Sequence, residues 1–503
     1  MMRFLFLVFP LFLFSNWAED TLATMTLDEK IGQLFVAPAC PLASEEHWVD
    51  WQRSMQEYGI GNAILKQSDP ASQIAFLDRL QEQAKIPLLV TADAEWGLAM
   101  RMSNTIAFPR NMTLGAIEDI DLIYQLGREI GRQARIVGIH MNLAPVADVN
   151  NNPANPVIHM RSFGEDPQRV AACVSAFARG LQASGTLACA KHFPGHGDTS
   201  VDSHRDLPVI PHGRERLESV EFVPFKQVID EGIGALMSAH LYVPALDPIY
   251  PTSLSPICLK GIARHQLGFK GLLISDALNM KAIADRYSPE QIALLARAAG
   301  CDLLLYGDHI APRINQIMRE TIPRAFKALK EAYLTGDLEL KDLDESVLRI
   351  LRAKEQIGLN QTRTAPSGDL HSQEALDLKK RLFQEAVTLI GKPVSLPENT
   401  AYLSFGSNDL LAQEFTGDLS SADCVVIAVH QKEALTEEVL ATIESLADRA
   451  VLCLFTSPYV LKHFHKQKTI LLAYENDPDA QQAIYQVLTG RAQAKGRLPI
   501  GYL

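Results

Sequence analysis

The sequence predicts an α/β fold, with a (β/α)8 TIM-type barrel followed by a smaller α/β sandwich domain. Eight short apolar runs alternate with segments whose apolar residues recur at helical spacing, which is the pattern of parallel βαβ units. Eight such units within roughly 300 residues fit a closed barrel better than an open sheet. The chain has 503 residues, of which 47% are hydrophobic, so more than one core is expected.

The eight expected barrel strands are short and apolar, and they span residues 33–36, 62–65, 88–92, 141–144, 187–190, 235–238, 272–275 and 302–305. Residues 117–136 and 170–183 lie between strands and show the apolar spacing of amphipathic helices. The helical segment 343–357 ends this unit. We therefore expect the barrel domain to occupy residues 19–358.

A linker rich in Thr, Pro and Ser is expected at residues 359–375, before a second domain at 376–503. The second domain should contain parallel strands at 402–405, 424–430, 450–455 and 469–474, with a helix at 479–488. It carries neither a GxGxxG pattern nor a phosphate-binding loop. A scaffolding or interface role is therefore expected for it.

The first residues resemble an export signal. Arg3 precedes an apolar run from Phe4 to Phe14, which is too short to span a bilayer but suits the core of a signal peptide. We expect residues 1–18 to be a signal peptide and the protein to be exported, to the periplasm or the extracellular space. An uncleaved anchor is the alternative, and no stable membrane span is expected after the leader is removed.

Charge and cysteine content argue against a nucleic-acid-binding protein and against a disulfide-rich protein. The formal net charge of -12 argues against nucleic acid as a partner, because phosphate backbones require a basic face. The seven cysteines include no CxxC pair and mostly lie in apolar runs, so we expect buried free thiols and no disulfide framework.

Polar residues follow five of the expected strands at their carboxyl ends, where barrel enzymes place their chemistry. They are Asp93, Glu95, Asp148, Lys191, His192, His240 and Asp276. The segment 191–208, KHFPGHGDTSVDSHRDLP, leaves one of these strands and holds three histidines and three aspartates. A polar loop that leaves a buried strand is typical of an active site.

Two groups in these segments suit acid–base and nucleophilic chemistry. Asp276 could be a helix N-cap, but together with the histidine-rich loop it is better interpreted as a nucleophile, since a carboxylate can attack an anomeric carbon. Asp202 and His204 stand two residues apart, so in an extended segment they point the same way. The carboxylate can then orient a ring that gives and takes a proton, although a solvated loop pair is the alternative.

The remaining candidates suit binding. His192 and His196 invite a metal interpretation with Asp198 or Asp202, but the intervening proline and glycine prevent a shared helix face. Lys191 and His192 fit better as hydrogen-bond donors to substrate hydroxyls.

Two arginines, Arg101 in DAEWGLAMR and Arg161 in RSFGEDP, either clamp a polar substrate or pair with Glu95 or Asp166. Asp93 either accepts hydrogen bonds from vicinal hydroxyls or caps a loop.

The motifs KHFPGHGDTSVDSHRDLP, RSFGEDP, DAEWG and ISDALNM together resemble glycoside hydrolase family 3. Within it they resemble the β-N-acetylglucosaminidases that act on peptidoglycan fragments. The resemblance implies a barrel, no metal or organic cofactor, and N-acetylglucosamine-containing muropeptides as substrates. It implies retaining hydrolysis with Asp276 as nucleophile, His204 as acid/base and Asp202 as its partner. It also implies that the terminal sugar is bound by Asp93, Arg101, Arg161, Lys191 and His192.

Two departures from the family pattern affect the expected sugar site. DxEGGRVxR is common after the third strand, whereas this chain has Trp96 in place of a glycine and Leu98 in place of an arginine. The nucleophile motif is SDALNM where SDDLSM is commoner.

Three alternatives stay open. A histidine acid/base carries no negative charge when deprotonated, so an anionic acceptor meets less repulsion, and a β-N-acetylglucosaminide phosphorylase is the runner-up. The others are a metal-dependent barrel hydrolase and an inactive sugar-binding protein, against which the presence of both Asp276 and His204 argues.

Overall fold

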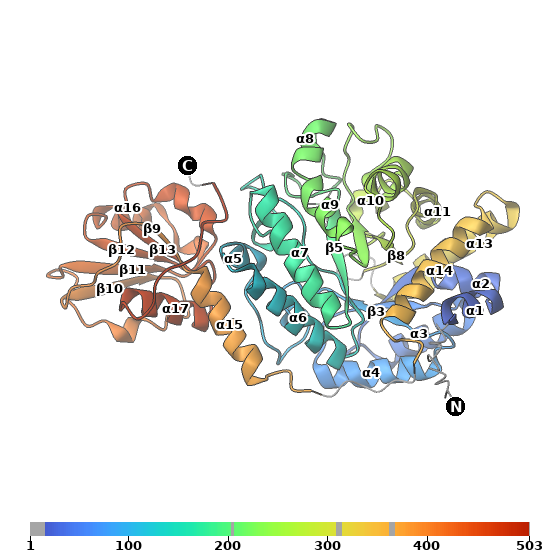
Figure 1. Ribbon diagram of the computed structural model, residues 1–503, viewed down its shortest axis with the longest axis horizontal. Helices are drawn as coiled ribbons and strands as arrows, with labels where there is room; N and C mark the ends of the chain where they lie inside the picture. The colour runs from blue at the N-terminus through green and yellow to red at the C-terminus, as the bar shows by residue number, and fades with distance from the viewer. Residues whose placement is uncertain (1–15, 203–205, 308–313, 362–367, 502–503) are drawn as a thin grey trace, which may run out of the picture.

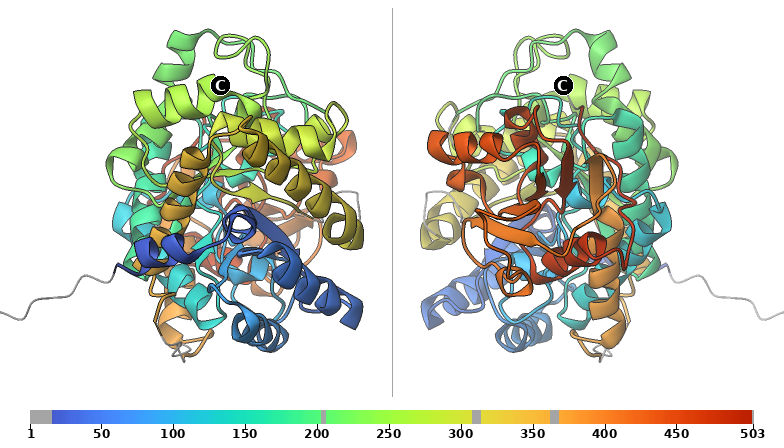
Figure 2. Two further views of the ribbon diagram at one scale, coloured as in Figure 1. Left: turned by 90° about the vertical axis from the view of Figure 1, so that its right-hand side faces the viewer. Right: turned by 90° about the vertical axis from the view of Figure 1, so that its left-hand side faces the viewer.

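The computed structural model describes residues 16–202, 206–307, 314–361 and 368–501 of the chain. It contains an eight-stranded parallel barrel and a separate five-stranded sheet (Figure 1). The sequence prediction of a barrel followed by a smaller α/β domain is therefore confirmed. Figure 2 views the molecule from its two ends, with the smaller domain in front in the right-hand view.

The barrel sheet has the strand order β7-β6-β5-β4-β3-β2-β1-β8. A parallel bridge between Ile274 and Leu303 brings the two outer strands together and closes the cylinder. Every residue of these strands is buried, as expected for a parallel sheet whose two faces are both covered. The strands are β1 Phe35–Ala39, β2 Asn62–Leu65, β3 Leu89–Ala92, β4 Met141–Asn142, β5 Leu187–Phe193, β6 Ala235–Ser238, β7 Leu272–Ser275 and β8 Leu304–Leu305.

Helices surround the barrel, and the longer ones are amphipathic and bury one face. They are α1 Trp17–Thr24, α2 Leu27–Gly32, α3 Glu45–Tyr58, α4 Pro70–Gln83, α5 Asn111–Gly115, α6 Ile120–Ile136, α7 Pro167–Ala183, α8 Arg214–Ser219, α9 Phe222–Asp230, α10 Lys281–Ala284, α11 Pro289–Ala299, α12 Ile314–Gln316, α13 Ile322–Thr335 and α14 Leu340–Gln356. Short 3-10 turns and two π-helical segments complete the barrel domain: η1 Leu98–Met100, η2 His159–Arg161, η3 Thr252–Leu254, η4 Ile257–Gln266 and η5 Ile317–Thr321.

Differences from the expected strands have local causes. β1 begins two residues later than expected because Gln33 caps α2, its N–H donating to the carbonyl of Glu29. β5 continues to Phe193, so Lys191 and His192 belong to a buried strand, whereas the sequence prediction placed them in a loop.

The second domain comprises α15 Gln373–Ala386 and the residues that follow it. α15 begins inside the segment 359–375 that was expected to be a linker. Its sheet has the order β10-β11-β12-β13-β9, and its elements are β9 Thr388–Gly391, β10 Thr400–Phe405, η6 Ala412–Glu414, β11 Cys424–Val429, η7 Lys432–Ala434, α16 Glu437–Ser445, β12 Ala450–Leu454, η8 Pro458–His463, β13 Thr469–Leu472 and α17 Pro478–Leu488.

One strand of the second domain was not predicted. β10 to β13 are parallel, as expected, but β9 pairs antiparallel with β13 at the edge of the sheet. β9 is only four residues long and three of them are partly exposed or exposed, so its apolar run is too short to indicate a strand.

The two domains are in contact through residues that follow strands β12 and β13 of the second domain. Glu475, which follows β13, accepts hydrogen bonds from the backbone N–H of Arg110 and the hydroxyl of Thr113. The hydroxyl of Tyr459 lies 2.7 Å from Asn150 Nδ2. Both contacts reach segments that follow barrel strands β3 and β4.

All seven cysteines are free, and six of them are buried, which confirms the prediction of buried thiols. No helix in the described part of the chain is both long and apolar enough to cross a membrane. Residues 1–15 of the expected signal peptide 1–18 lie outside the described residues. Ala18 belongs to α1 and is fully buried against the barrel.

The amino-terminal end of the barrel holds a buried lysine. Lys354 of α14 is 0% exposed, and its ammonium donates to the side-chain oxygen of Gln33 at 2.6 Å and to the carbonyl of Gly61 at 3.0 Å. Both acceptors are neutral. Burial therefore lowers the pKa of Lys354 from 10.5 to about 7.

This lowered pKa predicts a pH-dependent stability. Between pH 7 and 10.5 the unfolded chain holds a proton on Lys354 that the native protein lacks, so stability rises with pH by at most about 1.4 kcal/mol per pH unit. In Lys354→Met this contribution is absent. The advantage of wild type over the variant should therefore grow between pH 7.5 and 9.5, measured by urea unfolding followed through tryptophan fluorescence. Lys330→Met, which removes a surface ion pair with Asp28, is the control, and an equal pH response in both variants would contradict the prediction.

Candidate active site

A pocket of about 260 Å³ lies at the carboxyl ends of the barrel strands. Its wall combines apolar strand residues with charged residues that follow strands. The lining residues are Ile64, Asp93, Glu95, Trp96, Met100, Arg101, Leu143, Val157, Arg161, Lys191, His192, His196, Met237, Asp276 and Leu305. Six of the eight side chains predicted to act in catalysis or binding are thus brought into one cavity.

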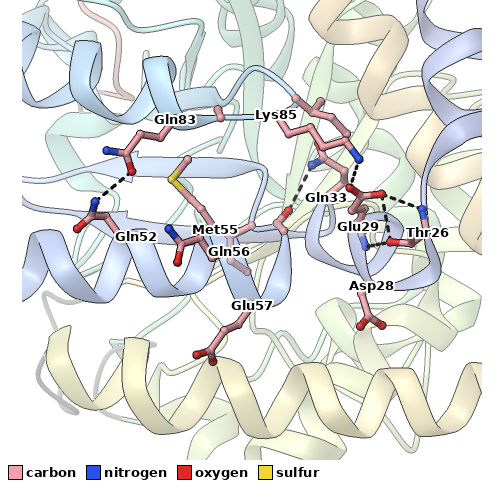
Figure 3. A pocket seen from close by; sticks show the side chains of 14 residues that line it. Thr26, Asp28, Glu29, Gln33, Gln52, Met55, Gln56, Glu57, Gln83 and Lys85 are labelled. Carbon is pink, nitrogen blue, oxygen red and sulfur yellow. Dashed lines mark hydrogen bonds and ion pairs between the residues drawn. The ribbon is translucent and has the colours of Figure 1, made fainter.

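A larger pocket, of about 750 Å³, lies at the opposite end of the barrel, beside the residues that precede β1, β2 and β3. Figure 3 shows hydrogen bonds among several of its polar side chains. Gln52 donates to Gln83 at 3.2 Å, and Glu29 accepts from Lys85 and from the backbone N–H of Thr26. None of the predicted site residues lines it, so it is not the candidate active site.

Asp276 stands directly after β7 and lines the pocket. Its backbone N–H donates to the carbonyl of Ser238 on β6, and its Oδ1 accepts from the N–H of Ala277 at 2.7 Å. These bonds hold the carboxylate at the mouth of the barrel. It does not cap a regular helix, because α10 begins only at Lys281.

The floor of the pocket is a network of buried charges. The ammonium of Lys191 lies 2.8 Å from Oδ1 of Asp93 and 2.8 Å from Oε1 of Glu95. Arg101 bonds the other oxygen of Asp93 at 2.6 Å, and Arg161 bonds both oxygens of Glu95 at 2.7 and 3.0 Å. Arg161 therefore pairs with Glu95. The alternative partner, Asp166, caps α7 instead.

The network fixes the ionisation of its members. Burial opposes ionisation of Asp93, but the charges of Lys191 and Arg101 outweigh it and hold the pKa of Asp93 well below its usual range. Burial likewise opposes ionisation of Glu95, yet Arg161 and Lys191 lower its pKa to about 2. Burial would lower the pKa of Lys191, but the two carboxylates raise it. The floor is therefore fully charged at neutral pH.

A buried carboxylate orients the two histidines of the pocket. Asp148 is 0% exposed, and its Oδ2 lies 2.7 Å from His192 Nδ1 while its Oδ1 accepts the backbone N–H groups of His192 and His196. Arg161 Nη2 lies 3.4 Å from His192 Nε2. Since arginine can only donate, Nε2 accepts and Nδ1 carries the hydrogen bound to Asp148. Nε2 is thus the nitrogen turned toward the arginine in the pocket.

His196 is held differently. Its Nδ1 lies 3.0 Å from the hydroxyl of Thr199, and its ring is nearly perpendicular to that of His192 at 6.0 Å between centroids. Burial, together with the neighbouring His192, lowers the pKa of His196 to about 4. Asp198, offered above as a metal ligand, bonds His212 at 2.7 Å, so it does not converge on the two rings.

The predicted acid/base pair lies on the loop after β5. His204 is outside the described residues. Asp202 is described but is not among the residues that line the pocket. Asp206, near the end of this loop, accepts a hydrogen bond from Arg286 at 3.1 Å. The end of the loop therefore lies close to the segment that follows β7.

Sequence reasoning gave no role to Asp148 and treated Glu95 only as a partner for Arg161. The available signal was their position after strands, which Asp93 and Asp276 share. Asp148 differs from them because it is completely buried beneath two histidines. This burial depends on the path of the chain after β4, which the local sequence does not reveal.

Comparison with known proteins points to one family. Residues 26–353 match the description "Glycosyl hydrolase family 3 N terminal domain". A solved structure of a glycoside hydrolase family 3 beta-N-acetylglucosaminidase from Paenibacillus sp. str. FPU-7 shares 31% sequence identity and a TM-score of 0.81, and the alignment covers 95% of this chain and 99% of that one.

Two curated relatives are also similar. Beta-hexosaminidase A of Pseudoalteromonas piscicida is 34% identical over 328 residues, which are 60% of this chain and 54% of the relative. A beta-N-acetylglucosaminidase/beta-glucosidase of Cellulomonas fimi is 30% identical over 362 residues, which are 70% of this chain and 61% of the relative. The chain thus spans less than two thirds of the length of each.

The charge network predicts a large cost for losing Glu95. Glu95→Gln leaves Lys191 and Arg161 incompletely balanced in a buried site, so the free energy of unfolding should fall by about 3 kcal/mol at neutral pH. Because the native pKa of Glu95 is depressed from 4.5 to about 2, its ionic contribution is complete above pH 4.5 and is lost as pH falls through 2. The difference from wild type should therefore be equal at pH 7.0 and 5.5 and smaller at pH 3.5, measured by urea unfolding.

Glu29→Gln is the matched control, since it removes a partner of Lys85 at the surface. Its cost should stay below about 1 kcal/mol. A Glu95→Gln protein as stable as this control would contradict the role of the network.

Proposed function

The chain belongs to glycosyl hydrolase family 3, and from this premise we propose that it is a retaining exo-β-N-acetylglucosaminidase. In this proposal it releases terminal N-acetylglucosamine from peptidoglycan-derived fragments. The observation that carries the proposal is the shared pocket of Asp276, Asp93, Lys191 and Arg161 at the carboxyl end of the barrel. A cavity of about 260 Å³ also suits one sugar ring better than a long chain, which supports an exo mode of action.

In the first step of the proposed mechanism the carboxylate of Asp276 attacks the anomeric carbon, and a glycosyl ester forms as the bond to the aglycone breaks. His204 gives its proton to the departing oxygen, and Asp202 stabilises the charged ring. In the second step His204 takes a proton from water, which attacks the ester and releases the sugar with its original anomeric configuration. The anchoring of Asp206 to Arg286 supports this arrangement, because it holds the end of the loop beside the segment after β7.

The charged floor supplies the proposed sugar contacts. Asp93 and Glu95 can accept hydrogen bonds from sugar hydroxyls, whereas Lys191, Arg101 and Arg161 can donate them. His192 borders the same pocket and is held in place by Asp148 at Nδ1 and by Arg161 at Nε2. These groups are held rigid by one another before any substrate arrives, which reduces the ordering cost of binding.

The proposal includes export. The apolar run Phe4–Phe14 supports a signal peptide at residues 1–18, and an exported enzyme would meet wall fragments directly. It also assigns residues 19–358 to the catalytic domain, 359–375 to the linker and 376–503 to the second domain.

Digestion of purified muropeptides tests the overall proposal. Mass analysis should identify free N-acetylglucosamine, and nuclear magnetic resonance at early times should show the β-anomer. The digestion is repeated with inorganic phosphate. Release of a sugar 1-phosphate in its presence would favour a phosphorylase, and loss of activity after exhaustive chelation would favour a metal-dependent hydrolase.

Asp276→Asn tests the nucleophile. The amide cannot form the ester, so kcat/KM should fall by roughly a thousandfold or more. A slow fluorinated N-acetylglucosaminide should add one sugar to the wild-type mass and none to the variant. Asp285→Asn, a surface substitution nine residues further on, should label as wild type. Labelling of Asp276→Asn would contradict the assignment.

His204→Ala tests the acid. A disaccharide or muropeptide has a poor leaving group and needs the proton, so its hydrolysis should slow by about a hundredfold or more. An aryl glycoside with a strongly acidic phenol needs none, so its formation of glycosyl-enzyme should slow by less than about tenfold. Steady-state and burst kinetics on both substrates measure this contrast. Equal slowing of the two would contradict the acid role.

A further inference from the structure

Trp96 occupies a position in the pocket that the family pattern gives to glycine. It follows Glu95 of the charged floor and lines the cavity. Its side chain is partly exposed, and its backbone carbonyl accepts the N–H of Phe108 at 3.0 Å. Among the described residues the indole N–H has no hydrogen-bond partner. A large aromatic group with an available donor thus lies in the pocket wall, next to the charged residues.

The ring of Trp96 is held from outside the pocket. The guanidinium carbon of Arg110 lies 4.7 Å from the ring centroid, which is a cation–π contact. This contact uses one face of the indole. The rest of the ring that borders the cavity remains available to a ligand.

Arg110 is in turn held by the second domain. Glu475 accepts the backbone N–H of Arg110 at 2.7 Å and the hydroxyl of Thr113 at 2.5 Å, and its other oxygen lies 3.7 Å from Arg110 Nε. The preceding residue, Tyr474, has a φ of 69°, which is uncommon for a residue with a side chain. The end of β13 therefore turns sharply at the point where Glu475 reaches the barrel.

We propose that Trp96 is a specificity-determining residue whose indole packs against the bound sugar, and that Glu475 of the second domain positions it through Arg110. The inference rests on the proposed function, because it takes the pocket to be the sugar site. An indole suits this role since its apolar face covers the C–H face of a pyranose while its N–H can bond a sugar oxygen. The second domain thereby contributes to the pocket wall without entering it.

Binding is tested first, with N-acetylglucosamine as the probe and tryptophan fluorescence as the readout. The sugar should change the emission of wild type, and Trp96→Phe should lose that change. Trp48→Phe is the matched control, because Trp48 also lies beneath a guanidinium, that of Arg79 at 3.9 Å, away from the pocket. It should retain the change. An unaltered response in Trp96→Phe would overturn the proposed contact.

Kinetics on an aryl N-acetyl-β-glucosaminide then separate contact from positioning. Trp96→Ala should raise KM about tenfold with kcat within about threefold of wild type, and Trp96→Phe should restore most of the loss. Arg110→Met and Glu475→Gln should each raise KM by about threefold, whereas Arg79→Met should not. If Arg110→Met and Glu475→Gln behave like Arg79→Met, the second domain does not position the ring.

These outcomes are distinguishable from failure of the proposed function. A protein that binds N-acetylglucosamine through Trp96 but cleaves no β-N-acetylglucosaminide would contradict the enzymatic proposal and leave the aromatic contact standing. Normal cleavage of the substrate by Trp96→Ala would contradict the aromatic contact and leave the enzymatic proposal standing. Circular dichroism and the thermal midpoint of each variant identify any that fail to fold. In that case the test is carried by Trp96→Phe, which keeps an aromatic ring, and by Glu475→Gln, which keeps the size of the side chain.

Discussion

The buried ammonium of Lys191 is the constraint around which the carboxyl end of the barrel is arranged. It lies on β5 and bridges Asp93 and Glu95, which both follow β3, across the intervening strand β4. A buried charge of this kind is tolerated only when it is fully paired. Each member therefore fixes the others, and the pocket floor is rigid before a ligand binds. The same pairing extends outward to Arg101 and Arg161, which close the network at its rim.

The two ends of the barrel treat buried charge in opposite ways. At the carboxyl end, three cations, Lys191, Arg101 and Arg161, line the pocket with three carboxylates, those of Asp93, Glu95 and Asp276. At the amino end, the partners of Lys354 among the described residues are the neutral oxygens of Gln33 and Gly61. A charged lysine is therefore stable in the first setting and penalised in the second. Permanent charge is maintained at the end of the barrel where polar ligands would be bound.

Much of the fold could be predicted because its signals are local. Residues 62–65, 235–238 and 272–275 are apolar runs with polar neighbours, and each became a strand with those bounds. The carboxyl ends of β3 and β7 then placed Asp93 and Asp276 at one end of the barrel. Signals that depend on distant chain segments were missed. Neither the burial of Asp148 beneath two histidines nor the antiparallel position of β9 follows from neighbouring residues, because each depends on how remote elements pack.

The departure DAEWGLAMR from the family pattern keeps one glycine of the turn and replaces the residues on either side of it. Leu98, where the family pattern has arginine, is 1% exposed and belongs to the core of the barrel domain, so its side chain adds no charge to the pocket. Gly97 between the two replaced positions has a φ of 91°, and a Cβ there would lie 2.9 Å from the ring of Phe108. The turn therefore still requires its second glycine. Leu98 is buried and does not line the pocket. Of the two replaced residues, Trp96 is therefore the one that changes the chemistry of the pocket, because its side chain lines the cavity.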